Sequence, residues 1–117
     1  MCGIFGVLGD YYNGLSNLNL ALLEHRGPDS NGVLENKKQK LIFAHTRLAI
    51  IDAVKRSNQP MVSKCKKYSI TYNGEIYNFL NLKKYLETKG IFFKTNSDTE
   101  VILNGYKYSG TSFFNKL

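Results

Sequence analysis

Cysteine is scarce in this sequence, and long hydrophobic runs are absent. Only Cys2 and Cys65 are present, too few for a disulfide framework and without the paired CxxC spacing of a zinc site, so we expect no metal in this chain. No run of about 18 apolar residues occurs, and the first residues lack the basic and then apolar pattern of a secretory signal. We therefore expect neither membrane insertion nor export, which leaves the cytoplasm as the expected location. We expect Cys65, within KCKK, to be an exposed thiol without a functional role.

Apolar and aromatic residues are plentiful by contrast. Hydrophobic residues make up 43% of the chain, with eight Tyr and seven Phe, which excludes intrinsic disorder. The 117 residues fit one domain, because single cores span roughly 50 to 200 residues. A net charge of +7 is compatible with an acidic partner such as nucleic acid, but the lysines are scattered in small groups without a continuous basic stripe. A solvated lysine-rich surface is the favoured interpretation, and a small nucleic-acid-binding protein is the alternative.

Predicted strands outnumber predicted helices. Apolar runs, alternation and glycines predict buried strands, a hairpin around the polar NKKQ stretch, and a loop over 52–60 that ends in Pro60. The predicted strands are residues 2–9, the hairpin 31–46 with its continuation over 47–52, residues 67–73 and residues 91–95. Strand groups joined by hairpins, with helices inserted between them, predict the α+β class with an antiparallel sheet.

Three segments have helical patterns. Leucines at helical spacing from Leu15 to Leu23 predict a helix that ends before the HRGPDS loop. A second helix is predicted over 79–89, with Gly90 where a left-handed C-terminal residue is needed. Ser97, with Glu100 three residues later, has the spacing of a capping box and predicts a helix through about residue 108. The last residues, 111–117, are expected to leave an uncovered apolar edge formed by Phe113, Phe114 and Leu117.

Cys2 is a candidate nucleophile, because removal of Met1 would place its thiol beside a free α-amine. An unperturbed α-amine has a pKa of about 7.7 to 8 and a thiol one near 8.5, so proton exchange between the two costs little. Gly3 leaves room for a substrate carbonyl beside the sulfur. Taken alone, MCGIFG is a weak signal.

An acyl-transfer site also needs donors for the oxyanion. The side-chain amide of Asn73 and the backbone N–H of Gly74 could face one small volume, although Asn-Gly is also the commonest signature of a tight hairpin turn. Arg47, a lone arginine among apolar residues, either pairs internally or grips a ligand carboxylate. Glu75 and Asp98 are candidate partners for a ligand ammonium, with a helix-cap role as the alternative for Asp98. Together these groups suit an α-amino acid whose side-chain carbonyl is attacked.

Six segments carry a family resemblance. They are MCGIFGV at the start, HRGPDSNG at 25–32, AHTRLAIID at 44–52, NQP at 58–60, YNGEIYN at 72–78 and SDTEVIL at 97–103. In this order they resemble the N-terminal glutaminase domain of class II glutamine amidotransferases, which are N-terminal-nucleophile hydrolases. The similarity is strongest to the asparagine synthetase branch, because related branches share CGIFG and SDTEV but not HRGPD, RLAIID and NGEIYN.

The resemblance implies a role for each matching residue. Cys2 would attack the glutamine side-chain amide to give a thioester and ammonia, and Asn73 and Gly74 would form the oxyanion hole. Glutamine would be held at its α-carboxylate by Arg47 and at its α-ammonium by Glu75 and Asp98. The pocket would be lined by the backbone of four consecutive residues, Leu48, Ala49, Ile50 and Ile51.

The resemblance also implies a fold and a partner. The expected fold is a four-layer αββα sandwich of antiparallel sheets, incomplete at the C-terminus because family domains continue well past residue 117. Ammonia would pass to a synthetase domain that uses ATP and Mg to amidate aspartate, and this chain contains no such domain. The alternatives are a catalytically inactive fragment or subunit that needs a partner chain, and an amidotransferase with an acceptor other than aspartate.

Overall fold

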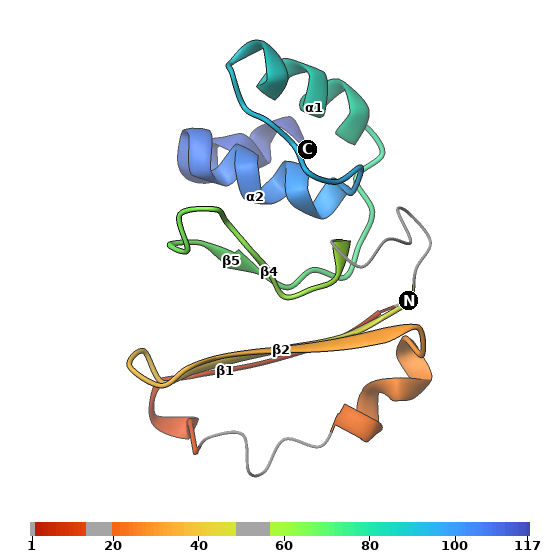
Figure 1. The fold of residues 1–117 in the computed structure, drawn as a ribbon, viewed down its shortest axis with the longest axis vertical. Helices are drawn as coiled ribbons and strands as arrows, with labels where there is room; N and C mark the ends of the chain where they lie inside the picture. Colours follow the sequence, from red (N-terminus) through yellow and green to blue (C-terminus); the bar gives the residue numbers. More distant parts are fainter. Residues whose placement is uncertain (1, 14–19, 49–56) are drawn as a thin grey trace. The chain divides into compact units, whose positions relative to one another are not determined.

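A computed structural model describes residues 2–13, 20–48 and 57–117, and its chain divides into two compact units. The first unit comprises Met1–Ile50, Asn58–Pro60 and Thr71–Asn73, and the second comprises Ile51–Ser57, Met61–Ile70 and Gly74–Leu117. The order of elements along the chain is drawn in Figure 1. Both units contain antiparallel strands, and the second also contains α-helices, so the mixed α and β composition with antiparallel sheets is confirmed.

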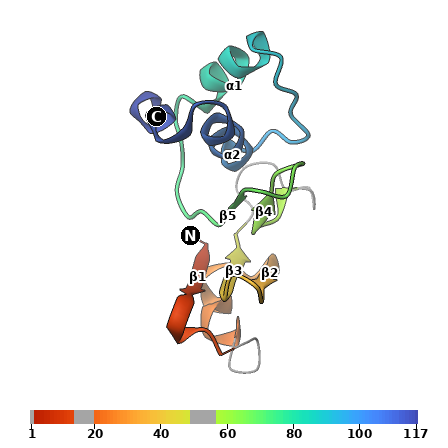
Figure 2. The same cartoon turned by 90° about the vertical axis from the view of Figure 1, so that its left-hand side faces the viewer.

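The first unit is built on a three-stranded antiparallel sheet in the order β1 (Gly3–Leu8), β3 (Leu41–Arg47), β2 (Ser30–Asn36), as Figure 2 shows. The predicted hairpin is confirmed as β2 and β3. Its turn is closed by Asn36, whose Oδ1 accepts the Gln39 N–H at 3.1 Å, and by Lys40 with a left-handed φ of 50°. Strand β3 is central and buried as predicted, with Ile42 and Ala44 in the core. Its continuation over 49–52 lies outside the described residues.

Strand β1 is present where the sequence predicts it, but it is not buried. Ile4, Phe5 and Leu8 are 48%, 38% and 68% exposed, because β1 lies at the edge of the sheet and has a neighbour on one side only. One 3-10 turn, η1 (Gly9–Tyr11), follows the strand. The antiparallel register pairs Gly3 with Thr46, so the start of β1 lies beside the end of β3.

The described part of the predicted first helix is a 3-10 helix and not an α-helix. Residues 14–19, the first part of the predicted helix, lie outside the described residues, and Leu20–Arg26 form the 3-10 helix η3. The Leu23 carbonyl accepts a hydrogen bond from the Thr46 hydroxyl at 2.8 Å, and the Gly27 N–H bonds three residues back to Glu24 O at 3.1 Å. Because the carbonyl that an α-helix would offer to Gly27 is bound to strand β3, the segment winds more tightly.

The second unit contains a minimal two-stranded ladder, β4 (Met61–Val62) and β5 (Ser69–Ile70). The strand predicted over 67–73 is therefore too long. After Ile70 the backbone leaves the ladder, and the Tyr72 N–H binds the side-chain Oε1 of Gln59 instead, at 2.6 Å. Two residues are too few for an alternating pattern to be visible, so β4 was not predicted.

Both predicted helices of this unit are confirmed, as α1 (Phe79–Thr88) and α2 (Asp98–Ser109). Gly90, with φ 80°, ends α1 in a Schellman motif: its N–H binds Glu87 O and the Ile91 N–H binds Leu86 O. Ser97 caps α2 by accepting the Glu100 N–H at 3.2 Å. The helices are joined in one core by buried Leu82, Leu86, Val101 and Ile102.

One prediction for this unit is wrong, and another is wrong for one of its three residues. Residues 91–95 form no strand, because the carboxylate of Glu100 takes the N–H groups of Lys94 and Thr95 that a strand would use. The final segment forms the 3-10 helix η5 (Gly110–Lys116), in which Phe113 is completely buried and so does not belong to an open apolar edge. Phe114 and Leu117 remain about half exposed, as expected of an apolar edge.

Across the described parts of the chain, no helix has the length and apolar character needed to cross a membrane.

Candidate active site

The thiol of Cys2 is held at the end of strand β3. Its Sγ accepts a hydrogen bond from the Leu48 N–H at 3.4 Å and lies 3.7 Å from the Leu48 carbonyl oxygen. On the other side, Arg26 Nε donates to the Cys2 carbonyl at 3.3 Å. Pairing of Gly3 with Thr46 brings these groups together, so the sulfur lies next to the residue that follows Arg47. Cys2 is half-buried, and its thiol is held by the backbone of Leu48.

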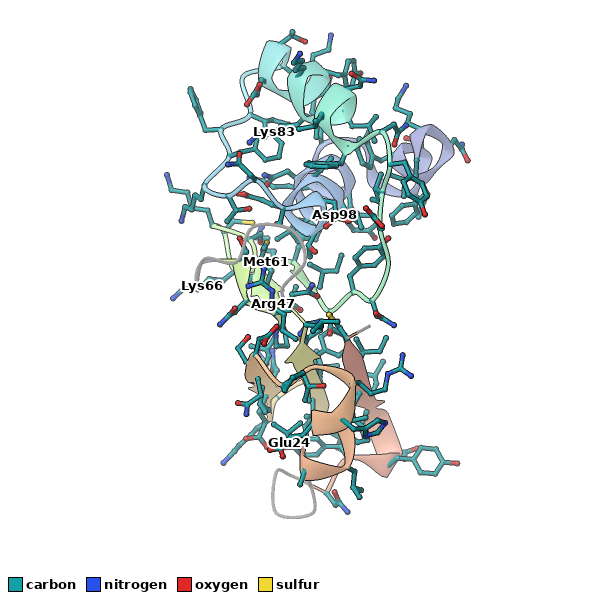
Figure 3. The ribbon with its side chains drawn as sticks, turned by 90° about the vertical axis from the view of Figure 1, so that its right-hand side faces the viewer. Glu24, Arg47, Met61, Lys66, Lys83 and Asp98 are labelled. Atoms are coloured by element: carbon teal, nitrogen blue, oxygen red, sulfur yellow. The ribbon has the colours of Figure 1, made fainter. Side chains whose placement is uncertain are left out.

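Arg47 is the last residue of β3 and is only 6% exposed (Figure 3). Its Nη1 donates to the Asn58 Oδ1 at 2.8 Å, and that same oxygen accepts the Ser30 hydroxyl at 3.2 Å. A buried guanidinium needs hydrogen-bond partners, and Asn58 fixes the direction of one edge of its fork. Asn58 was not singled out from the sequence, and its only signal there was its place in the NQP segment.

Asn73 belongs to the first unit as well, and its side chain is exposed. The residue before it, Tyr72, is bonded through both of its backbone groups. Its N–H donates to Gln59 Oε1 at 2.6 Å, and its carbonyl lies 3.3 Å from His45 Nε2. Sequence reasoning missed both His45 and Gln59, although each lies inside a segment that carries the family resemblance.

Gly74, Glu75 and Asp98 belong to the second unit. Gly74 and Glu75 are exposed, whereas Asp98 is buried at the start of α2. Its Oδ2 accepts the Ile76 N–H at 3.1 Å and its Oδ1 accepts the Thr99 N–H at 2.8 Å. Asp98 therefore ties the loop that follows Gly74 to the N-terminus of α2, a structural role close to the cap alternative. Ser97, not Asp98, is the cap residue itself.

The Asn73–Gly74 pair does not close a β-hairpin. The chain continues from Glu75 into helix α1, which begins at Phe79, as the sequence predicts. The first unit thus brings Cys2, Arg47 and Leu48 together and also contains Asn73, while the second holds Gly74, Glu75 and Asp98. Three predicted pocket residues, Ala49, Ile50 and Ile51, lie outside the described residues.

Three titratable side chains among the described residues have shifted pKa values, and the first is Tyr12, whose pKa is raised by its hydrogen bond with Glu35. Burial lowers the pKa of His45, and the neighbouring charge of Arg47 lowers it further, although the contact with the Tyr72 carbonyl acts in the opposite direction. Cys65 is exposed as predicted, and a hydrogen bond with Ser63 lowers the pKa of its thiol. Cys65 belongs to the second unit and Cys2 to the first. Among the residues that the structure describes, no group of His, Cys, Asp and Glu is arranged to hold a metal ion.

The Cys2 sulfur is bonded to the N–H of the residue that follows Arg47, in a chain whose segments resemble class II glutamine amidotransferases. Comparison with known proteins shows the family. The model of the glutamine amidotransferase domain family matches residues 1–117. The chain belongs to this family. As a glutamine amidotransferase domain, it is 39% identical over 116 residues to asparagine synthetase [glutamine-hydrolyzing] 1 of Bacillus subtilis, covering 92% of this chain and 18% of that protein.

Eukaryotic relatives are equally similar to this glutamine amidotransferase domain. It is 40% identical over 122 residues to asparagine synthetase [glutamine-hydrolyzing] 1 of Arabidopsis thaliana, covering 100% of this chain and 20% of that protein. It is 37% identical over 123 residues to the probable asparagine synthetase [glutamine-hydrolyzing] of Dictyostelium discoideum, covering 100% of this chain and 22% of that protein. The chain therefore spans about a fifth of the length of these curated relatives.

Proposed function

We propose that this chain hydrolyses glutamine to glutamate and ammonia, with Cys2 as the nucleophile. The observation that carries the proposal is the position of the Cys2 sulfur, which accepts the Leu48 N–H directly after buried Arg47. Hydrolysis of a glutamine side chain by a thiol needs a nucleophile and a group that recognises the amino-acid carboxylate, and we assign these roles to Cys2 and Arg47.

In the proposed reaction, loss of Met1 exposes the α-amine of Cys2, which takes the thiol proton. The thiolate attacks the side-chain carbonyl carbon of glutamine, and negative charge develops on the carbonyl oxygen. The Asn73 side-chain amide and the Gly74 N–H stabilise that oxyanion. The protonated α-amine then passes this proton to the amide nitrogen, the C–N bond breaks, and ammonia leaves. Water attacks the resulting thioester, which releases glutamate and restores the thiol.

Substrate recognition follows the polarity of an α-amino acid. Arg47 binds the α-carboxylate, because its guanidinium fork matches two carboxylate oxygens. Glu75 and Asp98 bind the α-ammonium, and the backbone of Leu48 together with Ala49, Ile50 and Ile51 lines the pocket. Asp98 keeps its hydrogen bonds to Ile76 and Thr99 in this proposal, since a carboxylate offers about four lone-pair sites.

The wider setting is proposed from the relatives. Their names describe glutamine-hydrolysing asparagine synthetases, and their greater length leaves room for a second active site. We propose that residues 1–117 are the N-terminal part of a four-layer αββα glutaminase domain in a cytoplasmic enzyme. Ammonia would pass from it to a synthetase domain that binds ATP and Mg and amidates aspartate. Asparagine formation from glutamine, aspartate and MgATP by the whole polypeptide tests this acceptor, and transfer to another acceptor alone would contradict it.

Glutamate release from glutamine tests the nucleophile. The chain is prepared with Cys2 as its first residue, verified by mass spectrometry, and compared with Cys2→Ala and with the matched control Cys65→Ala. We expect the wild type and Cys65→Ala to release glutamate at the same rate and Cys2→Ala to be at least about 1000-fold slower. Equal release by the wild type and Cys2→Ala, or no release by any of the three, would contradict the proposal.

Carboxylate recognition is tested with Arg47→Lys. The single ammonium cannot reproduce a bidentate contact, so we expect the KM for glutamine to rise about 10- to 100-fold with a small change in kcat. Lys64→Arg, which exchanges the same two kinds of cation at an exposed position of the second unit, is the matched control and should leave the KM unchanged. A fall in kcat at constant KM would instead assign Arg47 to the transition state.

A further inference from the structure

His45 is a buried histidine that the proposed reaction does not use. It lies in central strand β3, opposite Ile4 on β1 and Gly32 on β2, and its side chain is completely buried. A buried imidazole is costly unless its nitrogen atoms find partners. Its Nε2 has one, because it lies 3.3 Å from the carbonyl oxygen of Tyr72.

The geometry assigns the proton of His45 to that nitrogen. Its Nδ1 is buried and has no hydrogen-bond partner among the described residues. A proton on Nδ1 would be a buried donor without an acceptor, whereas a proton on Nε2 is donated to a carbonyl. Burial and the charge of Arg47 also lower the pKa of His45, which favours the neutral ring. The tautomer with Nε2–H is therefore the one that satisfies both atoms best.

Gln59 holds the same residue, Tyr72, through its other backbone group. Its Oε1 accepts the Tyr72 N–H at 2.6 Å, and its side chain is buried. Its backbone is fixed in turn against strand β2, since a Cβ built on Gly32 would come within 2.2 Å of the Gln59 carbonyl oxygen. Two side chains on rigid supports thus bind both backbone groups of Tyr72.

Tyr72 directly precedes Asn73, and this gives the contacts a functional meaning. An oxyanion hole works because its donors are already in position before charge develops, so the residues that carry them need a fixed backbone. We propose that His45 and Gln59 are positioning residues that clamp both backbone groups of Tyr72, its N–H and its carbonyl, and thereby orient the oxyanion donor Asn73. The inference rests on the proposed function for its catalytic meaning, and neither side chain touches substrate.

Two histidine variants separate the hydrogen bond from the bulk of the ring. His45→Gln places an amide nitrogen as many bonds from Cβ as Nε2 and keeps a donor for the Tyr72 carbonyl. His45→Asn carries its amide nitrogen one bond closer to Cβ, at the level of Nδ1, and cannot reach. Both are made in a Cys65→Ser background, so that Cys2 is the only thiol.

Amide hydrogen exchange at Tyr72, followed by NMR, reports the clamp without any turnover. We expect His45→Asn to speed this exchange about tenfold and His45→Gln to restore most of the protection. In glutamine hydrolysis, His45→Asn should lower kcat about 10- to 100-fold with little change in KM, and His45→Gln should recover most of the loss. Alkylation of Cys2 by iodoacetamide needs no oxyanion hole and should proceed at the same rate in all three proteins.

Several results would overturn the clamp. One is an equal rate of Tyr72 amide exchange in His45→Asn and the wild type. Another is the same exchange rate and the same kcat in the Asn and Gln variants. A third is an effect of His45→Asn on the KM for glutamine or on the rate of Cys2 alkylation. If His45→Asn does not fold, 15N NMR of the wild-type ring decides: a proton on Nε2 supports the clamp, and one on Nδ1 refutes it. If the exchange and NMR results are as expected but the wild type does not hydrolyse glutamine, the proposed function is refuted and the clamp is not.

Discussion

At the residue scale, the two buried acids at the start of α2 have different partners. Asp98 accepts the N–H groups of Ile76 and Thr99, whereas Glu100 accepts those of Lys94 and Thr95 together with the Thr95 hydroxyl. The sequence assigned Glu100 to a capping box, but its carboxylate does not reach back to Ser97, whose N–H binds Thr95 Oγ1 instead. A motif defined by spacing identified the helix start correctly and the carboxylate's partners incorrectly.

We expect His45 to contribute to the loss of stability at acid pH. Its pKa is held below the ordinary value of about 6.5, so the unfolded chain takes up a proton that the folded protein resists. Its contribution to stability is complete above about pH 6.5 and is lost as the pH falls through the folded pKa. We expect the urea midpoint of the wild type to fall more between about pH 7.5 and pH 5.5 than that of His45→Gln.

The matched control for this titration is His25→Gln, which replaces the other histidine at an exposed position. It should lose as much stability on acidification as the wild type. If His45→Gln shows the same loss as both, the pH dependence comes from other groups and the assignment to His45 is wrong.

At the element scale, the packing of η5 against α2 depends on one glycine. A Cβ built on Gly105 would come within 2.2 to 2.4 Å of three ring atoms of Phe113, a side chain with no exposed surface. Glycine in a helix interior costs about 1 kcal/mol relative to alanine, so this position gives up helix propensity for close approach. The buried ring compensates, since removing a phenylalanine from a core costs about 3 to 5 kcal/mol.

Gly105→Ala should therefore destabilise the protein although alanine favours helices. Overpacking costs about 1 to 3 kcal/mol against a gain in propensity of about 1 kcal/mol, which leaves a net loss of up to about 2 kcal/mol in urea denaturation. Leucine lacks the outer ring atoms, so in a Phe113→Leu background the same substitution should cost clearly less. An equal cost in both backgrounds would show that the clash with the ring is not the cause.

Strand prediction at this scale succeeded where the pairing is local and failed where it is not. The β2–β3 hairpin has its partner strand a few residues away along the chain, and its register follows from the turn at 37–40. The apolar run 91–95 has equally good β-propensity, but the N–H groups of Lys94 and Thr95 donate to the Glu100 carboxylate and not to a neighbouring strand. Propensity describes a segment, whereas a strand also needs a neighbour.

At the scale of the whole molecule, the first unit is assembled from distant parts of the chain. Its sheet comes from the first 47 residues, but the partners of that sheet come later in the chain. Asn58 binds Arg47, Tyr72 binds His45, and Gln59 binds Tyr72. A buried charge left without its partner costs several kcal/mol, a large share of the total stability of a small domain. The later segments are therefore part of the unit's stability and not only of its candidate site.

A pair of fragments tests this dependence. Residues 1–73 contain every segment of the first unit, whereas residues 1–50 lack Asn58–Pro60 and Thr71–Asn73. We expect dispersed amide NMR signals for β1, β2 and β3 in the longer fragment and their loss in the shorter one. Equally good dispersion in both would show that the sheet folds without these contacts, and its absence from both would show that the second unit is also required.

Features that depend on residues close together in the sequence could be predicted, whereas contacts between distant residues required the tertiary structure. The sequence by itself determined the family, both α-helices, the hairpin and the candidates Cys2 and Arg47, because caps, turns and motif blocks depend on residues within a few positions of one another. Only the tertiary structure decided that Asn58 binds Arg47, that His45 and Gln59 hold Tyr72, and that Phe113 is buried. Those contacts join residues eight to 27 positions apart, and they exist only once the chain has closed on itself.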